Sequence, residues 1–310
     1  MAGTTRKTAA DFDPEVLRLF DKYVHGAIDR RGILEAAAKF AVGGVTAAGL
    51  LEALSPKFAE AEQVAKTDPR IKAETVEFAS PQGYGSGRGY LVRPASASPL
   101  GGAAPAPTRG LPVVLVVHEN RGLNPHIEDI ARRLAVDNFI AFAPDALHPL
   151  GGYPGDEDRA RDLFGKLNQA RTREDFFAAA NHLKGVPGGN GKMGVTGFCW
   201  GGGITNELAT RLPDLAAAVP FYGEAPPLDQ VPNIKASLIL MFADKDDRIN
   251  AGWPPYEAAL KKAGVGFQAY RYPGTEHGFN NDTTPRYDAA AAQQAWQRTI
   301  AFFNRQLRGA

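Results

Sequence analysis

The chain carries the stretch KMGVTGFCWGG at residues 192–202, and this stretch decides the fold. Residues 192–196 predict a short buried strand, and residues 202–212 predict the helix that follows it. Between them stands Gly-x-Cys-x-Gly, the pattern of a sharp strand-to-helix turn that presents a nucleophile, here the sulfur of Cys199. The glycines have no Cβ, so backbone and helix can approach closely.

Cys199 is open to two interpretations. A helix N-terminus beneath the sulfur would stabilise the thiolate, which is the attacking species. A free cysteine is also commonly a buried structural residue. Cys199 is the only cysteine among 310 residues, which excludes an intrachain disulfide. The motifs that follow in the chain favour the nucleophile.

A nucleophile on such a turn needs a base and an acid that orients the base, in the chain order nucleophile, acid, histidine. The apolar run 237–243 predicts a buried strand that ends in three competing aspartates. We favour Asp246 as the acid, because it lies three residues after the end of the strand and three before an isoleucine that can return to the core. Asp247 is the close alternative, and Asp244 fits a solvated turn better.

The base is predicted to be His277. It stands in a glycine-flanked loop after the last predicted strand, 266–272, from which it can reach back over the sheet. The other histidines receive no catalytic role: His25 and His182 are predicted on the surface, His126 and His148 in loops, and His118 packed at a strand end.

Glu119 follows residues 111–117, the apolar run that predicts a central strand. The loop after this strand supplies one backbone N–H of an oxyanion hole in such folds, here that of Asn120, and the residue after the nucleophile, Trp200, supplies the other. A charge at a buried strand end needs a partner. For Glu119 we weigh an ion pair with Arg121 or another arginine against a contact with the thiol, and favour the thiol.

Strand and helix patterns alternate along the rest of the chain. This alternation predicts an α/β fold with a mostly parallel sheet and helices on both faces. A hairpin, 75–78 and 90–93, precedes the strands, and its glycine-rich tip lacks the following helix that a phosphate site requires. Residues 95–110, rich in Pro, Ala, Gly and Ser, predict an exposed loop. The further predicted strands are 140–144 and 216–221, and the helices are 127–136, 172–183, 254–263 and 288–307.

Five motifs together resemble the dienelactone hydrolase (carboxymethylenebutenolidase-like) family of the α/β-hydrolase superfamily. They are VHENRGLN (117–124), GFCWGG (197–202), FYG (221–223), DDRI (246–249) and EHGF (276–279). The resemblance spans about residue 75 to the C-terminus. It implies that Cys199 attacks an ester or lactone carbonyl, and that His277 is the base oriented by Asp246. It also implies that Glu119 holds the thiol in the resting enzyme and moves aside for substrate.

The sequence departs from this family in one respect. Members that cleave dienelactone bind the substrate carboxylate with two arginines, one of them shortly after the catalytic histidine. Here no arginine follows His277 before Arg286, and the loop 145–158 offers only Arg159 and Arg161 at its end. We therefore expect a different small ester or lactone as substrate.

The predicted activity is hydrolysis of carboxylic esters or lactones through a thioester intermediate. The alternatives are a broad-specificity carboxylesterase and a non-catalytic binding protein that retains the fold. No metal or organic cofactor is expected, because HENRG at 118–122 has glycine where a zinc-binding H-E-x-x-H needs its second histidine. The net charge of +1 argues against a nucleic-acid partner, which requires a basic stripe.

Residues 1–70 predict a separate N-terminal extension of the catalytic domain 71–310. Its first helix, 14–24, starts with Asp13 as a cap and proline in the first turn. Paired arginines at 30–31, the uncharged run 40–51 and AEA at 59–61 resemble a twin-arginine leader, which predicts export to the periplasm.

The extension has a second interpretation. The uncharged run is shorter than the ~20 residues of a membrane span, so stable membrane insertion is not expected. Acidic residues before the arginine pair argue for the alternative, a retained helical arm, which would keep the enzyme in the cytoplasm; of the two interpretations we favour export. Such an arm would pack on the enzyme itself or on a second subunit, and so join a homo-oligomer.

Overall fold

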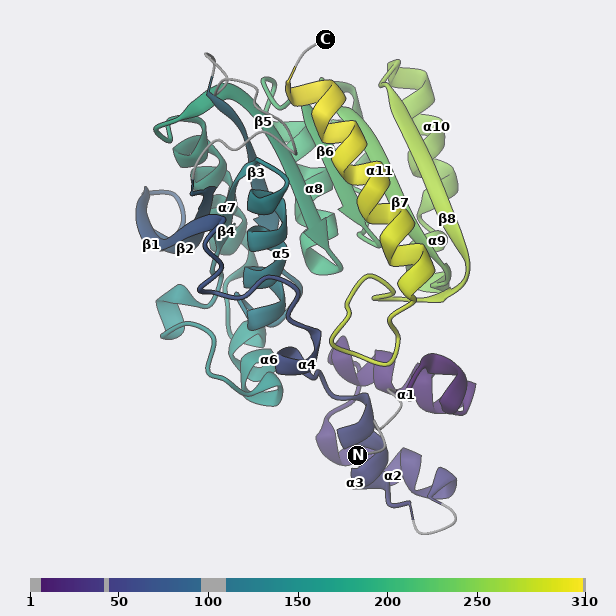
Figure 1. Ribbon diagram of the computed structural model, residues 1–310. Coiled ribbons are helices and arrows are strands. Elements are labelled where there is room, and N and C mark those ends of the chain that lie inside the picture. Colours follow the sequence, from purple (N-terminus) through teal and green to yellow (C-terminus); the bar gives the residue numbers. More distant parts are fainter. Residues whose placement is uncertain (1–6, 42–44, 96–109, 309–310) are drawn as a thin grey trace.

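The computed structural model describes residues 7–41, 45–95 and 110–308 (Figure 1). Most of the predicted exposed loop 95–110 therefore lies outside the described residues. The described chain forms one eight-stranded sheet with helices on both faces, which confirms the predicted α/β-hydrolase architecture. None of the helices in the described ranges combines the length and the apolar character that crossing a membrane would require.

The sheet has the strand order β1-β2-β4-β3-β5-β6-β7-β8. The ribbon of β1 and β2 pairs antiparallel within itself and against β4, and all the other neighbours are parallel. The strands are β1 (Ile71–Ser80), β2 (Gly85–Pro94), β3 (Leu111–Val117), β4 (Ile140–Pro144), β5 (Gly189–Phe198), β6 (Ala217–Phe221), β7 (Ser237–Lys245) and β8 (Phe267–Glu276).

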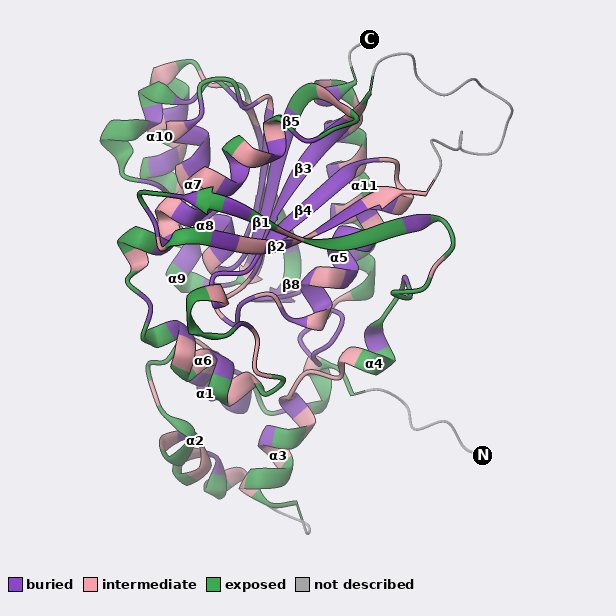
Figure 2. Ribbon diagram, turned by 90° about the vertical axis from the view of Figure 1, so that its left-hand side faces the viewer, coloured by how far each residue is buried: buried purple, intermediate pink, exposed green. Residues whose placement is uncertain are grey.

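Alternate side chains of each central strand enter two different cores. In β3, Val113 and Leu115 face a cluster with α7, α8 and α10, whereas Val114 and Val116 face a cluster with α5 and α11. Because both faces are covered, β3, β4 and β6 are apolar throughout and almost completely buried, and β5 is buried from Met193 onward (Figure 2). The helices are α5 (Pro125–Val136), α7 (Gln169–Lys184), α8 (Trp200–Arg211), α10 (Trp253–Ala263) and α11 (Ala289–Leu307).

Two short helices complete the catalytic domain. Helix α9 (Asp247–Asn250) follows β7. Helix α6 (Glu157–Gly165) begins at the end of a segment that the Gly- and Pro-rich sequence predicted as a loop. It forms because the Asp156 carboxylate accepts a hydrogen bond from the backbone N–H of Arg159 at 2.7 Å and so caps the first turn.

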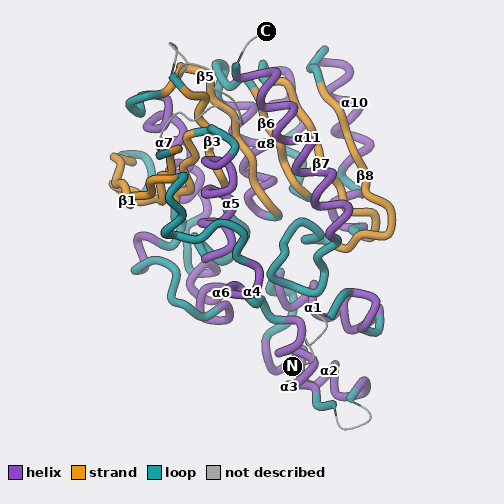
Figure 3. The backbone as a smooth tube through the Cα atoms, in the orientation of Figure 1, coloured by secondary structure: helices purple, strands orange, loops and turns teal. Residues whose placement is uncertain are grey.

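The described residues of the N-terminal extension form four α-helices, which we call the arm: α1 (Pro14–Val24), α2 (Arg30–Ala37), α3 (Ala47–Leu54) and α4 (Phe58–Ala61). The predicted cap is present, since Asp13 accepts from the backbone N–H of Glu15 at 2.8 Å. The arm has a small apolar core of its own that includes Val16, Phe20 and Leu54. It lies across the edge of the sheet where the loops after the strands gather (Figure 3).

Candidate active site

Cys199 connects β5 to α8 with backbone angles φ 57° and ψ −117°. A non-glycine residue at positive φ is strained by about 1–3 kcal/mol, which the surrounding packing must hold in place. The flanking glycines are sterically required. A Cβ on Gly197 would lie 2.2 Å from the carbonyl oxygen of Gly201, and a Cβ on Gly201 would lie 2.4 Å from that of Val117. The sequence pattern therefore forms the sharp turn that it predicts.

The structure brings His277 to Asp246. The Nδ1 atom of His277 lies 2.5 Å from the Asp246 carboxylate, and both residues are buried. Asp246 is held in turn by the backbone N–H of Ile249 at 3.4 Å. The two competing aspartates lie elsewhere: Asp247 is exposed, and the Asp244 carboxylate pairs with Arg271 at 2.9 Å.

The other ring nitrogen of His277, Nε2, is buried, and the ring interacts with the Cys199 sulfur. A ring nitrogen of His277, a ring nitrogen of His25 and the Cys199 sulfur all lie within 4.8 Å of one another. The three residues Cys199, His277 and Asp246 thus come from three separate loops to one place at the edge of the sheet.

His25 is the residue that the sequence analysis missed. It was predicted on the surface, and that prediction is wrong: its side chain is only 18% exposed, and its Nε2 lies 3.4 Å from the sulfur of Cys199. Its ring meets that of His277 edge-on, with centroids 4.8 Å apart. The reason is local, because α1 ends at Val24 and Gly26 turns the chain with φ 77°, which directs His25 into the site.

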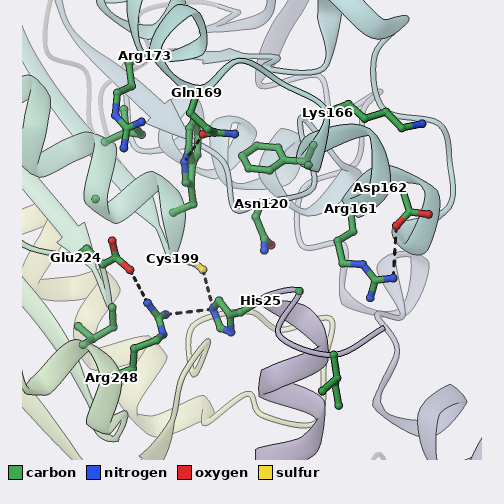
Figure 4. A pocket seen from close by; sticks show the side chains of 18 of the residues that line it. His25, Asn120, Arg161, Asp162, Lys166, Gln169, Arg173, Cys199, Glu224 and Arg248 are labelled. Carbon is green, nitrogen blue, oxygen red and sulfur yellow. Dashed lines mark hydrogen bonds and ion pairs between the residues drawn. The ribbon is translucent and has the colours of Figure 1, made fainter. Parts of the chain in front are cut away.

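Two further residues extend this contact outward. Arg248 places its guanidinium 3.2 Å from the same His25 nitrogen and binds Glu224 at 2.8 Å (Figure 4). On the other side of the ring, His25 Nδ1 lies 2.8 Å from the backbone oxygen of Asp21 and 3.3 Å from its carboxylate. The ring of His25 is therefore fixed at Nδ1 by oxygen atoms of Asp21, and its Nε2 faces the Cys199 sulfur.

The charges around the sulfur favour the thiolate. Burial alone would raise the pKa of the Cys199 thiol, but the positive charges of His277 and His25 outweigh it and lower this pKa to about 6. Burial lowers the pKa of His277, yet the Cys199 thiolate and Asp246 raise it to about 9. The pKa of His25 is raised in the same way by Cys199 and Asp21. A thiolate between two imidazolium rings is the favoured charge state.

Glu119 contacts neither of its two predicted partners. Its carboxylate accepts a hydrogen bond at 2.9 Å from the side-chain amide of Asn281, on the loop after β8. Arg121 lies instead against Asn120, at 2.8 Å, and Glu157, at 3.7 Å. The thiol has His25 as its hydrogen-bond partner, and this pairing is electrostatically better because a carboxylate and a thiolate repel each other.

The two residues predicted for the oxyanion hole flank the nucleophile. Trp200 is the first residue of α8, so its backbone N–H has no partner within the helix. Its indole stacks on His118, with ring centroids 5.6 Å apart. Asn120 follows β3, and its side-chain amide donates to the backbone oxygen of Val24 at 2.9 Å. The loop that carries Asn120 thus also binds the arm.

Cys199 lines two cavities. The larger, of about 750 Å³, is lined by His25, Asn120, Trp200 and Arg248, and by the cations Arg161, Lys166 and Arg173 on its outer wall (Figure 4). The smaller, of about 60 Å³, is lined by His277, Glu119, Arg286 and residues of α1. Arginines thus line both cavities, although none of them follows His277 closely in the sequence.

Residues 100–307 match the family model described as "Dienelactone hydrolase family". The chain belongs to the dienelactone hydrolase family. The resemblance inferred from the motifs is thereby confirmed, and the protein is a dienelactone hydrolase-like hydrolase. A second family model, described as "YqhI-like", matches residues 4–41, which include α1 and His25. This second match is the signal that could have drawn attention to His25.

Individual relatives agree with the family. An Escherichia coli K12 protein named "Putative carboxymethylenebutenolidase" is 33% identical over 208 residues, which cover 62% of this chain and 76% of the relative. The E. coli K12 protein "Putative hydrolase fragment YghX" is 52% identical over 119 residues, 38% of this chain and 93% of the relative. The crystal structure titled as a putative dienelactone hydrolase from Klebsiella pneumoniae is 29% identical, with a TM-score of 0.62, and covers 76% of this chain and 99% of its own.

Proposed function

We propose that this dienelactone hydrolase-like protein cleaves small carboxylic esters or lactones through Cys199, His277 and Asp246. The observation that carries the proposal is the geometry of His277. One ring nitrogen is held by the Asp246 carboxylate at 2.5 Å, and the other is buried beside the sulfur on the strained turn. This is the relation between acid, base and nucleophile that acyl transfer needs.

The reaction follows from these positions. The Cys199 thiolate attacks the carbonyl carbon, and the backbone N–H groups of Asn120 and Trp200 stabilise the oxyanion. The carbon–oxygen bond of the ester breaks as Nε2 of His277 gives its proton to the departing alkoxide, and a thioester remains. Water then attacks the thioester and gives a proton to His277, and the thiolate and a carboxylic acid are released.

Glu119 enters this scheme as a second partner of the thiol. It lines the small cavity together with Cys199 and His277. In this structure, where His25 contacts the thiol, the Glu119 carboxylate binds Asn281. We propose that Glu119 exchanges Asn281 for the thiol once His25 has moved away. Replacing Glu119 with Gln should then change both the reactivity of the thiol and hydrolysis. A variant that leaves both at wild-type values would make Glu119 a purely structural residue.

The experiment for the activity is an assay of p-nitrophenyl esters of increasing acyl length together with unsaturated lactones, in the presence of a chelator. Cys199→Ala is the control, and trapping a thioester by mass spectrometry identifies the acylated residue. Turnover of several acyl chains with lactones untouched would identify a broad carboxylesterase. A wild-type protein no faster than Cys199→Ala on every substrate would support the binding-protein alternative.

We also propose that the arm is retained in the mature enzyme. Arg30, the first residue of the predicted twin-arginine pair, binds Asp158 of the catalytic domain at 2.5 Å, and His25 sits on the thiol. A cleaved leader would lose both contacts. The intact mass of the protein purified from each compartment of the native cell tests this. A mature chain that starts after residue 61 would establish export and cleavage instead.

A further inference from the structure

We propose that His25, Cys199 and His277 form a binding site for a zinc ion, which ties the arm to the catalytic domain and blocks the nucleophile. This inference goes beyond the proposed hydrolysis, which requires the same sulfur to be free. Two of its three residues, His25 and Cys199, lie 174 positions apart in the sequence.

One of the three donor-atom separations already matches a zinc ion, and the others lie within 4.8 Å. Tetrahedral zinc with Zn–S near 2.3 Å and Zn–N near 2.0–2.1 Å requires sulfur–nitrogen separations of roughly 3.6 Å and nitrogen–nitrogen separations of roughly 3.3 Å. The observed separation between Cys199 Sγ and His25 Nε2 is 3.4 Å, and all three donor atoms lie within 4.8 Å. Only a small closing movement of one ring separates this arrangement from coordination.

Both imidazole rings already have the outer contacts that are typical of zinc-binding histidines. A metal-bound histidine almost always gives its other ring N–H to a carboxylate or a carbonyl oxygen, which fixes the tautomer and the orientation of the ring. His277 does this with Asp246 at 2.5 Å. His25 does it with Asp21, through the backbone oxygen at 2.8 Å and the carboxylate at 3.3 Å.

The third donor of the cluster is the Nε2 atom of His277. This residue is only 5% exposed, and its ring interacts with the Cys199 sulfur through a hydrogen bond and charge attraction. A histidine binds a metal in its neutral form, so zinc binding releases the proton that this nitrogen holds, and the ion replaces the positive charge beside the thiolate. The proposed hydrolysis uses the same nitrogen, so bound zinc and turnover exclude each other.

The donor set selects the type of metal. Two imidazole nitrogens and one thiolate suit zinc, whereas magnesium and calcium prefer oxygen ligands. Three protein ligands leave one position for water, which the 750 Å³ cavity beside His25 and Cys199 can supply. The guanidinium of Arg248 lies 3.2 Å from His25 Nε2 and must turn away when zinc binds, and Glu224 already binds it at 2.8 Å.

The test is a titration of the metal-free, full-length protein with zinc chloride in competition with a chromophoric chelator. We expect one zinc per chain and protection of Cys199 from iodoacetamide. His25→Ala should weaken zinc binding by about 100-fold or more, because it removes a ligand, and Asp21→Asn by about 10-fold, because it removes an outer contact. His182→Ala, which changes a histidine on α7 outside the cluster, should bind zinc like the wild type.

Two outcomes would overturn the site: no zinc bound at one equivalent, or equal zinc affinity in the wild type and His25→Ala. Thermal unfolding of each variant in chelator shows whether it is folded, and His25→Gln replaces the alanine variant if that one is not. Ester hydrolysis in chelator is measured separately. An active enzyme that binds no zinc refutes only the metal site, and a zinc-binding protein without hydrolysis refutes only the proposed function.

Discussion

The catalytic domain and the arm are held together in different ways. The central strands of the domain are buried on both faces among apolar side chains, and the arm closes a separate small core within its own helices. Between the two, several of the contacts at the active site are polar. Tyr23 and Arg30 bind Asp158, the backbone oxygen of Val24 accepts from Asn120, and Asp21 binds Arg286 at 3.3 Å.

This difference shows which part can move. Separating apolar cores exposes area at a cost of about 25 cal/mol per Å², whereas partly exposed ion pairs contribute only about 0–1 kcal/mol each. The polar contacts can therefore be exchanged for water without unfolding either region. We infer that the arm is a cover whose docking, unlike the fold of the domain, can be changed by single substitutions. The following predictions test that contrast.

The largest effect is expected within the domain, at the orienting acid. Asp246→Asn should lower kcat/KM for an ester by about 10³- to 10⁴-fold, because His277 loses the carboxylate that sets its tautomer. Asp247→Asn, one residue further along and exposed, is the matched control and should stay near wild-type activity. Steady-state kinetics on one p-nitrophenyl ester measures both. A larger loss in the Asp247 variant would reverse the assignment.

The second prediction concerns the positive charge that His25, on the arm, places beside the Cys199 sulfur of the catalytic domain. The lowered pKa of Cys199, about 6 against an ordinary value of 9.0, means that the thiolate persists as the pH falls and is lost only near pH 6. His25→Gln removes one of the two positive charges, so the inflection of the iodoacetamide rate should move to higher pH, while remaining below 9 because His277 is still present. His182→Gln is the control, and the pH profile is recorded in chelator. An unchanged inflection would show that His25 does not act on the sulfur.

The smallest effect is expected at the polar contact of the arm. Asp158→Asn weakens the contacts to Tyr23 and Arg30 together, and should speed alkylation of Cys199 by about two- to fivefold as the arm opens more often. Asp162→Asn changes a more exposed neighbour that pairs only with Arg161 at 3.6 Å, and it should leave the rate unchanged. Equal rates in the two variants would mean that the arm is held by its apolar contacts instead.

Several features could be predicted from the sequence because they have local causes. Residues 111–117 and 140–144 were predicted as strands with the bounds that the structure has, since a strand buried on both faces must be apolar throughout. The glycines around Cys199 predict the turn because no other residue fits against the backbone there. Cys199, Asp246 and His277 each follow the end of a parallel strand, and these strand ends meet at one edge of the sheet, so the sequence predicts that the three residues lie close together.

Only the tertiary structure decided what lies against these residues. His25 reaches the thiol across 174 positions, and Glu119 binds Asn281 in place of either expected partner. Polar contacts between distant segments leave no periodic pattern in the sequence, because each needs only one suitable atom on each of two segments that the fold brings together. The local pattern therefore determined the fold and the nucleophile, and the docking of the arm determined the surroundings of the sulfur.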